Sequence, residues 1–323
     1  MSDAPGRDAP EAGASGEAPG EARGGASVGA GGAKAGRPAG EDFQWLGPEP
    51  PELPAPSLAG RLAAYARLVA AVLGTAVLLG LYLLFKLIER AIPAFRLRAR
   101  VQRLWARYVG RLVGLKVRVE GTPMPHGGAL VANHASWSDI FVLVGAARLT
   151  FVSKAEVREW PGVGWIAAQC GTVFIERKRS AARAQEAELR ARMLAGERLL
   201  FFPEGTSTDG RRVLPFRSTL FAALTAPELR DVAWVQPVTV VYRPNPKSGL
   251  PDVFYGWWRD MDFAAHVWSV LTLSFGGEAD VVFHDPIRIA DLPDRKALAQ
   301  RSWEAVNAGL VARIPHPPQP AER

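Results

Sequence analysis

The chain has 323 residues, a formal net charge of +7 and a single cysteine, Cys170. One cysteine excludes a disulfide framework, and we interpret Cys170 as a small buried apolar residue rather than a catalytic thiol. The first 60 residues carry 4 basic and 9 acidic side chains, a net of −5, so the remainder carries about +12, which suits an anionic membrane surface, an acidic carrier protein or nucleic acid.

Residues 1–60 are dominated by Gly, Ala, Pro and Glu, and their only aromatic side chains are Phe43 and Trp45. Such a composition cannot bury enough apolar surface to offset the entropy lost on ordering. It predicts a disordered tail. The change of composition near residue 60 also predicts the first boundary: a tail at 1–60, a membrane anchor with a basic helix at 61–115, a globular domain at 116–315 and a second tail at 316–323.

An apolar stretch of 18 residues, 68–85, contains no charged side chain. A transmembrane helix needs roughly 17–25 such residues, so this stretch predicts a membrane-embedded helix. A helix that only enters the bilayer and a buried core helix are the alternatives. Residues 86–118 hold ten basic side chains and one acid, Glu89, and this bias places the following domain in the cytoplasm.

The basic stretch has a helical pattern. Its apolar residues recur at helical spacing and its arginines repeat that spacing one residue earlier. The apolar positions are Leu97, Val101, Leu104, Tyr108 and Leu112, and the arginines are Arg96, Arg100, Arg103, Arg107 and Arg111. The pattern predicts an amphipathic helix that can lie on anionic headgroups; the solvated face of an ordinary surface helix is the alternative.

From residue 116 onwards, short apolar runs alternate with helical patterns, which is typical of an α/β domain. Strands are predicted at residues 116–120, 129–132, 151–152, 172–175, 199–202, 234–242 and 279–283. Helices are predicted at 139–147, directly after the turn at 160–165, at 181–194, at 216–224 and at 295–312. Two polar clusters, NHASWSD at 133–139 and PEGTSTDG at 203–210, directly follow predicted strands, where α/β folds place their chemistry.

The first cluster contains His134 and, five residues later, Asp139. A carboxylate that accepts the proton of one imidazole nitrogen fixes the tautomer and leaves the other nitrogen as a general base. Such a base can take the proton of a hydroxyl that attacks a thioester, whose thiolate leaves readily. Ser136 invites a covalent Ser-His-Asp mechanism, but the sequence does not show where its hydroxyl points. A histidine bonded to a backbone carbonyl is the alternative for His134 taken alone.

The second cluster offers the Glu204 carboxylate, the flexible Gly205 backbone and the Thr206 hydroxyl, groups that can orient a polyol or line an anion site. Arginines follow it closely and can pair with a phosphate or carboxylate; they are Arg211, Arg212 and Arg217. A glycine turn with solvated arginines is the alternative.

Four blocks of this chain occur in the order found in one family: NHASWSD (133–139), GTVFIER (171–177), FPEGT (202–206) and VQPVTV (235–240). Together they resemble the membrane-bound glycerolipid and lysophospholipid acyltransferases, including the 1-acyl-glycerol-3-phosphate acyltransferases, over residues 105–241. The resemblance implies a mixed α/β sheet flanked by helices and preceded by a membrane-embedded helix and the basic amphipathic helix. It also implies a bacterial enzyme of the inner, cytoplasmic membrane.

The resemblance also implies roles for individual residues. His134 would deprotonate the acceptor hydroxyl and Asp139 would orient His134. The acceptor would be bound by Asn133, Arg177, Glu204, Gly205, Thr206, Arg211 and Arg217. Lys154 matches the family only loosely and is left out. The acyl donor would be acyl-ACP or acyl-CoA, with no other cofactor, metal or nucleic acid.

One departure concerns the acceptor. Family members that act on phosphate headgroups typically read FPEGTRS, whereas Ser207 stands here in place of that arginine. The fragments GTSTDGRRVLPFRSTLF and FYGWWRDM resemble the branch that O-acylates lyso-ornithine lipid, so we expect that acceptor. Lysophosphatidate is the alternative, with Arg211 or Arg217 supplying the missing charge.

Proteins of other classes explain less of the sequence. A nucleic-acid-binding protein would show aromatic residues interleaved with lysines in a recognisable motif. A non-catalytic membrane scaffold gives no reason for polar clusters at strand ends, and a serine hydrolase would offer a GxSxG elbow, which this sequence lacks. The aromatic run YGWW at 255–258, with Trp268, predicts packing in the core or an interface; a wall for the acyl chain is the alternative.

Overall fold

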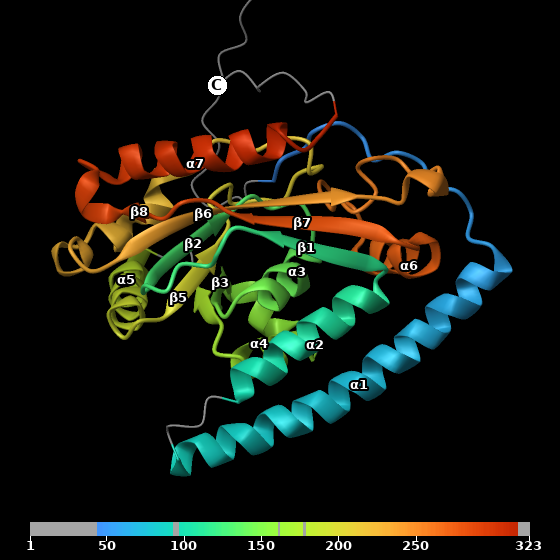
Figure 1. The fold of residues 1–323 in the computed structure, drawn as a ribbon, viewed down its shortest axis with the longest axis horizontal. Helices are drawn as coiled ribbons and strands as arrows, with labels where there is room; N and C mark the ends of the chain where they lie inside the picture. Colours follow the sequence, from blue (N-terminus) through green and yellow to red (C-terminus); the bar gives the residue numbers. More distant parts are fainter. Residues whose placement is uncertain (1–43, 93–96, 161, 177–178, 316–323) are drawn as a thin grey trace, which may run out of the picture. The chain divides into compact units, whose positions relative to one another are not determined.

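The computed structural model of the protein describes residues 44–92, 97–160, 162–176 and 179–315. These residues belong to one compact unit, Asp42–Arg323. Figure 1 shows a twisted central sheet with helices on both of its faces and a long helix, α1, that runs along one side. The mixed α/β fold that the sequence predicts is therefore present.

The sheet has eight strands in the described part of the chain, in the order β1-β7-β6-β2-β5-β3-β4, with β8 paired to β6. The strands are β1 Leu115–Glu120, β2 Gly128–Ala132, β3 Thr150–Lys154, β4 Val173–Ile175, β5 Arg198–Phe201, β6 Trp234–Arg243, β7 Gly277–Phe283 and β8 Ile287–Arg288. From β6 to β4 every pairing on the main path is parallel, whereas β7 runs antiparallel to β6. The carboxyl ends of β2 and β5 therefore meet at one edge of the sheet.

Helices cover both faces of this sheet. They are α1 Leu58–Ala91, α2 Arg98–Leu112, α3 Asp139–Ala146, α4 Val163–Gln169, α5 Arg179–Leu194, α6 Phe263–Leu273 and α7 Arg295–Val311. Short 3-10 helices are η1 Ala155–Glu159, η2 Ser218–Thr225, η3 Pro227–Leu229, η4 Pro246–Ser248 and η5 Ile289–Asp291. Alternate residues of β2 enter different cores: Leu130 joins the cluster that includes α3 and α6, and Val131 joins the cluster that includes α5, η2 and α7.

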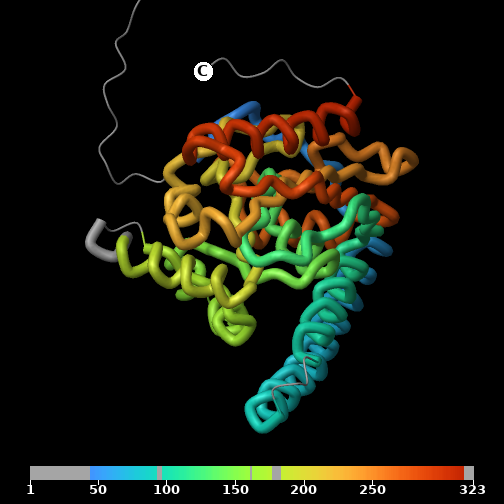
Figure 2. The backbone as a smooth tube through the Cα atoms, turned by 60° about the vertical axis from the view of Figure 1, so that its left-hand side comes forward, coloured from blue at the N-terminus to red at the C-terminus, as the bar shows by residue number. Residues whose placement is uncertain are grey.

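The helices α1 and α2 form an antiparallel arm that projects from the sheet domain, as Figure 2 shows. The arm is tied together where Trp105 of α2 donates its indole N–H to the Thr75 hydroxyl at 3.0 Å and the Tyr108 hydroxyl donates to the Ala70 carbonyl at 2.6 Å. Nearer the start of α1, the Arg67 guanidinium donates to two carbonyl groups at the end of α6. One face of α1 is thus held by protein along its length.

The opposite face of α1 is apolar and exposed. Its large exposed side chains include Leu62, Leu68, Val69, Val72, Leu73, Val77, Leu84 and Leu87. Among the described residues, α1 is the one helix long and apolar enough to cross a membrane. On α2, Arg100 and Leu104 are exposed, whereas the Arg107 guanidinium donates to the Gly145 carbonyl of α3 at 2.8 Å. The predicted basic helix is therefore exposed on one side and packed on α3 on another.

The structure differs from the sequence-based expectations at several elements. The helix α1 begins at Leu58, three residues before the predicted boundary, because Ser57 caps it by accepting from the Gly60 N–H at 3.1 Å. Residues 216–224 were expected to be helical, and the structure has a 3-10 helix there, Ser218–Thr225. The helix α6, which Asp262 caps, was not predicted at all. Its sequence is apolar on more than one side, because it packs on α1 and also contributes Val270 and Leu271 to the main buried cluster.

The aromatic run of residues 255–258 is buried apart from Trp257, which is half-buried. Tyr255 and Trp258 are buried, and Trp268 contacts Tyr65 of α1 edge to face, with ring centroids 5.3 Å apart. These positions agree with packing, in the core and between α6 and the arm.

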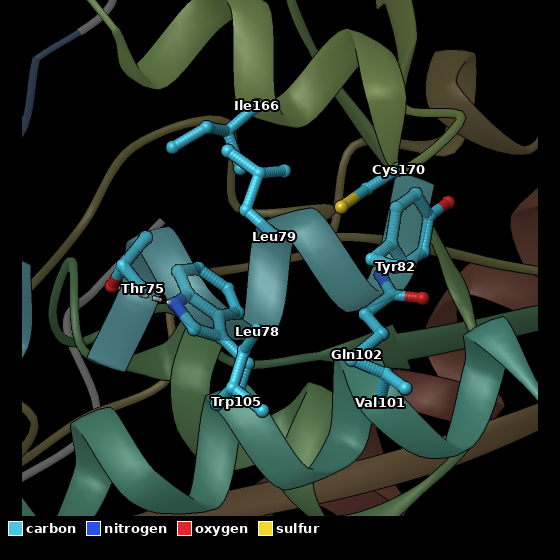
Figure 3. A pocket seen from close by; sticks show the side chains of 9 residues that line it. All are labelled: Thr75, Leu78, Leu79, Tyr82, Val101, Gln102, Trp105, Ile166 and Cys170. Carbon is cyan, nitrogen blue, oxygen red and sulfur yellow. Dashed lines mark hydrogen bonds between the residues drawn. The ribbon is translucent and has the colours of Figure 1, made fainter. Parts of the chain in front are cut away.

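A narrow apolar crevice lies between the arm and α4 (Figure 3). It is lined by Thr75, Leu78, Leu79, Tyr82, Val101, Gln102, Trp105, Ile166 and Cys170. The space open to a water-sized sphere is about 20 Å³, little more than one water needs, so an acyl chain does not fit. Burial raises the pKa of the Cys170 thiol to about 11, which keeps it protonated and unreactive at neutral pH.

Candidate active site

The two residues of the predicted dyad lie side by side at the carboxyl end of β2. His134 follows the strand by two residues, and Asp139 is the first residue of α3. The chain between them turns back on itself, and the His134 Nδ1 lies 2.7 Å from the Asp139 Oδ2. Nδ1 therefore carries its proton toward the carboxylate, and Nε2 is left as the basic nitrogen.

Asp139 is fully buried and saturated with hydrogen bonds. Its Oδ2 also accepts the backbone N–H groups of Ala135 (2.9 Å) and Ser136 (3.1 Å), and its Oδ1 accepts the Tyr242 hydroxyl at 2.6 Å. Burial, together with the Asp139 charge, raises the pKa of Tyr242 well above its ordinary value. Tyr242 thus stays protonated as a donor, and the first turn of α3 adds a favourable dipole for the carboxylate.

The imidazole of His134 is held but not buried. Its side chain is 22% exposed, and its ring stacks on Phe202 with centroids 4.0 Å apart and planes 11° apart. The backbone carbonyl accepts the Thr208 N–H at 2.9 Å. The loop after β5 therefore wraps around the residue after β2, and only the imidazole edge is left accessible.

Two residues that were expected to touch the acceptor, Asn133 and Glu204, instead form hydrogen bonds with backbone groups of the site. Both oxygens of the Glu204 carboxylate accept backbone N–H groups, those of His134 (2.7 Å) and Leu214 (2.8 Å). The Asn133 side chain pairs with the Val240 backbone, donating to its carbonyl (2.9 Å) and accepting its N–H (2.8 Å). Asn133 in effect extends the pairing of β2 with β6, and neither side chain has its polar atoms directed at a substrate.

Burial of Glu204 has an electrostatic consequence. Burial is the largest cause that raises its pKa to about 8, and the two backbone N–H groups oppose the rise. A carboxyl group with this pKa keeps its proton in most molecules at neutral pH.

Gly205 directly follows Glu204, and the basic side chain of Arg217 lies beside it. Gly205 has φ of +75°, and a Cβ on it would lie 3.3 Å from the Arg217 side chain. The Arg217 charge also contributes, after desolvation, to the lowered pKa of Lys154 at the end of β3. The positive charge of Arg217 thus acts on the Lys154 ammonium, although Lys154 is exposed. Lys154, which the sequence prediction left out, therefore lies within electrostatic range of Arg217.

The other predicted arginines lie elsewhere or are engaged. Arg211 pairs with Asp252 at 2.9 Å, and Arg212 pairs with Asp209 at 3.1 Å. Arg177 lies outside the described residues. The structure therefore brings Arg217, and not Arg211, to the Gly205 backbone.

Ser136 is not placed as a nucleophile. Its hydroxyl is buried and receives the Ser138 backbone N–H at 3.2 Å and the Ser138 hydroxyl at 3.0 Å. Within the described part of the chain, no hydrogen bond joins this hydroxyl to His134. The geometry favours direct transfer over a covalent intermediate on Ser136.

Sequence reasoning missed a second histidine that supports the site. His266 of α6 accepts the Trp137 indole N–H on Nδ1 at 2.8 Å, and its Nε2 lies 3.2 Å from the Phe254 carbonyl. Burial lowers the pKa of His266, so the neutral Nε2–H tautomer fits both contacts. The signal in the sequence is weak, because these partners are separated by 129 and 12 positions.

A mixed α/β sheet whose strand ends hold a His–Asp pair, backed by the FPEGT loop and flanked by a long apolar helix, defines an acyltransferase. A family model described as "Acyltransferase" matches residues 116–241. Two curated proteins are similar over much greater lengths, and both are named lyso-ornithine lipid O-acyltransferase.

The protein from Rhodobacter capsulatus is 46% identical over 279 residues, covering 83% of this chain and 98% of its own. That from Brucella abortus is 35% identical over 230 residues, covering 67% and 84%. The crystal structure of the 1-acyl-sn-glycerophosphate acyltransferase of Thermotoga maritima has the same fold, with a TM-score of 0.52 and 21% identity over 80% of this chain and 98% of that one. The chain belongs to this acyltransferase family and is a lyso-lipid acyltransferase, which confirms the predicted family and enzyme class.

Proposed function

We propose that this enzyme transfers a fatty acyl group from acyl-ACP or acyl-CoA to the hydroxyl group of lyso-ornithine lipid. The observation that carries the proposal is the 2.7 Å contact between the Asp139 carboxylate and Nδ1 of a partly exposed His134. That pair supplies a base of fixed tautomer and requires no metal or other cofactor.

The chemical step follows from this pair. The acceptor hydroxyl oxygen attacks the thioester carbonyl carbon while His134 Nε2 takes the hydroxyl proton. The tetrahedral intermediate collapses, the C–S bond breaks, and the imidazolium returns the proton to the leaving thiolate. Asp139 stabilises the imidazolium, and three further donors to its carboxylate hold it in place.

The preference for an ornithine head over a phosphate head rests on three observations. Ser207 stands where phosphate-binding relatives carry an arginine. Arg211 pairs with Asp252 and Arg212 pairs with Asp209, and the Arg217 side chain lies beside Gly205. The two long relatives are named for lyso-ornithine lipid. A single arginine with Lys154 suits the carboxylate of a zwitterionic head.

We further propose that α1 enters one leaflet of the cytoplasmic membrane without crossing it. Trp105 and Tyr108 hold the basic helix α2 against residues 70–75 of α1. If α1 crossed the bilayer, the arginines of α2 would lie in the hydrocarbon core, at several kcal/mol each. With α1 in the plane of the leaflet, its exposed apolar face meets lipid and the arginines meet headgroups. The sheet domain then lies on the cytoplasmic side.

The function is tested with the purified full-length protein, lyso-ornithine lipid in mixed micelles and a labelled acyl thioester. We expect ornithine lipid to form, and His134→Ala to abolish it while the protein still binds anionic vesicles. Lysophosphatidate as the sole productive acceptor would reverse the choice of head. Absence of transfer to any lyso-lipid would favour a non-catalytic membrane scaffold. Thin-layer analysis of a deletion strain provides the matching observation in cells, where lyso-ornithine lipid should accumulate.

A further inference from the structure

The hydrogen bonds to the Asp139 carboxylate have two origins. His134 Nδ1 and the backbone N–H groups of Ala135 and Ser136 all donate to Oδ2, and they come from the segment that leads into α3. The Tyr242 hydroxyl donates to Oδ1 at 2.6 Å and comes from the carboxyl end of β6, 103 positions away. Tyr242 therefore holds the second oxygen of the carboxylate from outside that segment.

The path of β6 explains why Tyr242 reaches Asp139. The strands β2 and β6 pair in parallel, and beyond the end of β2 the Asn133 side chain continues the pairing with the Val240 backbone. Side chains alternate along a strand, so Val240 and Tyr242 share one face, and both join the buried cluster that includes α3. Tyr242 thus faces α3 at the level where that helix begins, at Asp139.

The Tyr242 hydroxyl is held in place by its surroundings. The residue is buried, its backbone pairs with Ala279 of β7, and its ring packs on that of Tyr255 with centroids 5.7 Å apart. Burial and the nearby carboxylate raise the pKa of Tyr242 well above its ordinary value, so the hydroxyl keeps its proton and donates. The position of Oδ1 is consequently fixed by a rigid donor on the sheet.

This hydrogen bond affects the charge that the carboxylate presents to the imidazole. A donor to a carboxylate stabilises the anion and draws negative charge toward the oxygen that accepts it. Here the hydroxyl is at Oδ1 and the His134 imidazole is at Oδ2. Removal of the hydroxyl should therefore make Oδ2 a stronger partner of the imidazolium, and His134 Nε2 should hold its proton up to a higher pH.

Other titratable groups lie on the elements packed around the pair, but their polar atoms are bonded to groups other than Asp139. These residues are Glu204, Asp209, Tyr255, His266, Arg67 and Arg107. Arg243 and Asp280 pair with each other, and Asp280 lies opposite Val241 in the register, on the other face of the sheet from Tyr242. Among the described residues, His134 and Tyr242 are the titratable side chains that bond to Asp139.

We propose that Tyr242 is a positioning residue of the acyl transfer: its hydrogen bond fixes the Asp139 carboxylate and takes up part of its charge, which keeps the His134 imidazole free to act as the base near neutral pH. The inference rests on the role proposed for the His134–Asp139 pair and deepens it. It adds a residue that lies outside the four motif blocks, two positions after the last of them.

The test compares Tyr242→Phe with Tyr255→Phe in the full-length protein. Each change removes one hydroxyl from a pair of adjacent buried rings, but the Tyr255 hydroxyl bonds to Ser274 and not to Asp139. We expect the acidic limb of the pH profile of kcat/KM to shift to higher pH by about 0.5 to 1 unit in Tyr242→Phe, the range of one hydrogen bond. At a fixed pH on that limb, the rate should fall by about 3- to 10-fold. Tyr255→Phe should keep the wild-type limb.

A second measurement needs no acceptor. In NMR spectra of histidine-labelled protein, the His134 signal is assigned by its absence in His134→Ala, and its titration midpoint should rise in Tyr242→Phe but not in Tyr255→Phe. Incorporation of 3-fluorotyrosine at position 242, a stronger donor of nearly the same shape, should lower the midpoint. Thermal unfolding in detergent shows whether each variant keeps the fold.

A midpoint that does not rise in Tyr242→Phe, or that rises equally in both variants, would overturn the inference and leave Tyr242 a packing residue. A midpoint that 3-fluorotyrosine leaves unchanged would count against it in the same way. The proposed function is decided separately, because a wild type that acylates no lyso-lipid contradicts the function, whereas the histidine titration still decides the role of Tyr242.

Discussion

Replacing Asp139 by asparagine separates the charge of the carboxylate from its geometry. In the structure one oxygen, Oδ2, accepts three N–H groups, those of His134 Nδ1, Ala135 and Ser136. The other oxygen accepts the Tyr242 hydroxyl. An asparagine amide therefore has one favourable orientation, with its oxygen at the Oδ2 position and its NH₂ group toward Tyr242, whose hydroxyl turns to accept.

In this orientation the His134 tautomer is retained, and only the charge is lost. The charge of a neighbouring carboxylate is worth about 1 to 3 pKa units to an ion pair, so we expect kcat to fall by about 10- to 1,000-fold. In a Ser-His-Asp triad, where the amide imposes the wrong tautomer, the loss is about 10⁴-fold. The two mechanisms therefore predict different rates.

The assay is single-turnover acyl transfer with saturating thioester, for the wild type, Asp139→Asn and Asp139→Ala. Asp139→Ala leaves three N–H groups without their acceptor. It should therefore be slower than Asp139→Asn by at least a further factor of about 10, which corresponds to the loss of about one hydrogen bond. A loss near 10⁴-fold in Asp139→Asn, equal to that of Asp139→Ala, would refute the assignment of three donors to one oxygen.

Two further predictions concern stability. Glu204→Gln should destabilise the fold by about 1–3 kcal/mol, because an amide NH₂ cannot accept the N–H of His134 or Leu214. Burial raises the pKa of Glu204 from 4.5 to about 8, so the folded state keeps a proton that the unfolded state loses. The free energy of unfolding of the wild type should therefore fall as pH rises from about 4.5 to 8. Denaturant unfolding at several pH values should show a smaller fall in the variant. On α1, Gly60→Ala places a Cβ 2.7 Å from the Thr272 carbonyl oxygen, whereas Gly80 has no atom within 4 Å. We expect Gly60→Ala, but not Gly80→Ala, to increase proteolysis at the junction of α1 and α6; equal cleavage of both variants would contradict this packing.

The dyad could be predicted from the sequence because its signal is local. An apolar strand that stops at His134, with Asp139 five residues later, needs only one turn of chain to bring the two side chains together. The convergence of this segment with the FPEGT loop needed one more inference, that β2 and β5 are parallel, and the pairing of Val131 with Phe201 satisfies it.

What the sequence did not reveal depends on long-range contacts. Tyr242 reaches Asp139 across 103 positions, and Trp45 reaches Thr206 across 161. Neither separation can be predicted from the periodic pattern of a helix or a strand. Asn133 and Glu204 were assigned to the substrate because they are polar and lie in motif blocks, yet their polar atoms are used by backbone N–H and carbonyl groups. A motif residue can thus serve the shape of a site without touching its ligand.

The order of strands has a consequence for synthesis of the chain. The strand β1, which directly follows the arm of α1 and α2, has its partner in β7, Gly277–Phe283, and β7 also separates β1 from β6. Until residue 283 leaves the ribosome, the edges of β1 and β6 both remain open. Open edges are templates for pairing with other chains. Premature termination before β7 leaves both of these edges without their partner, so such truncated chains should aggregate.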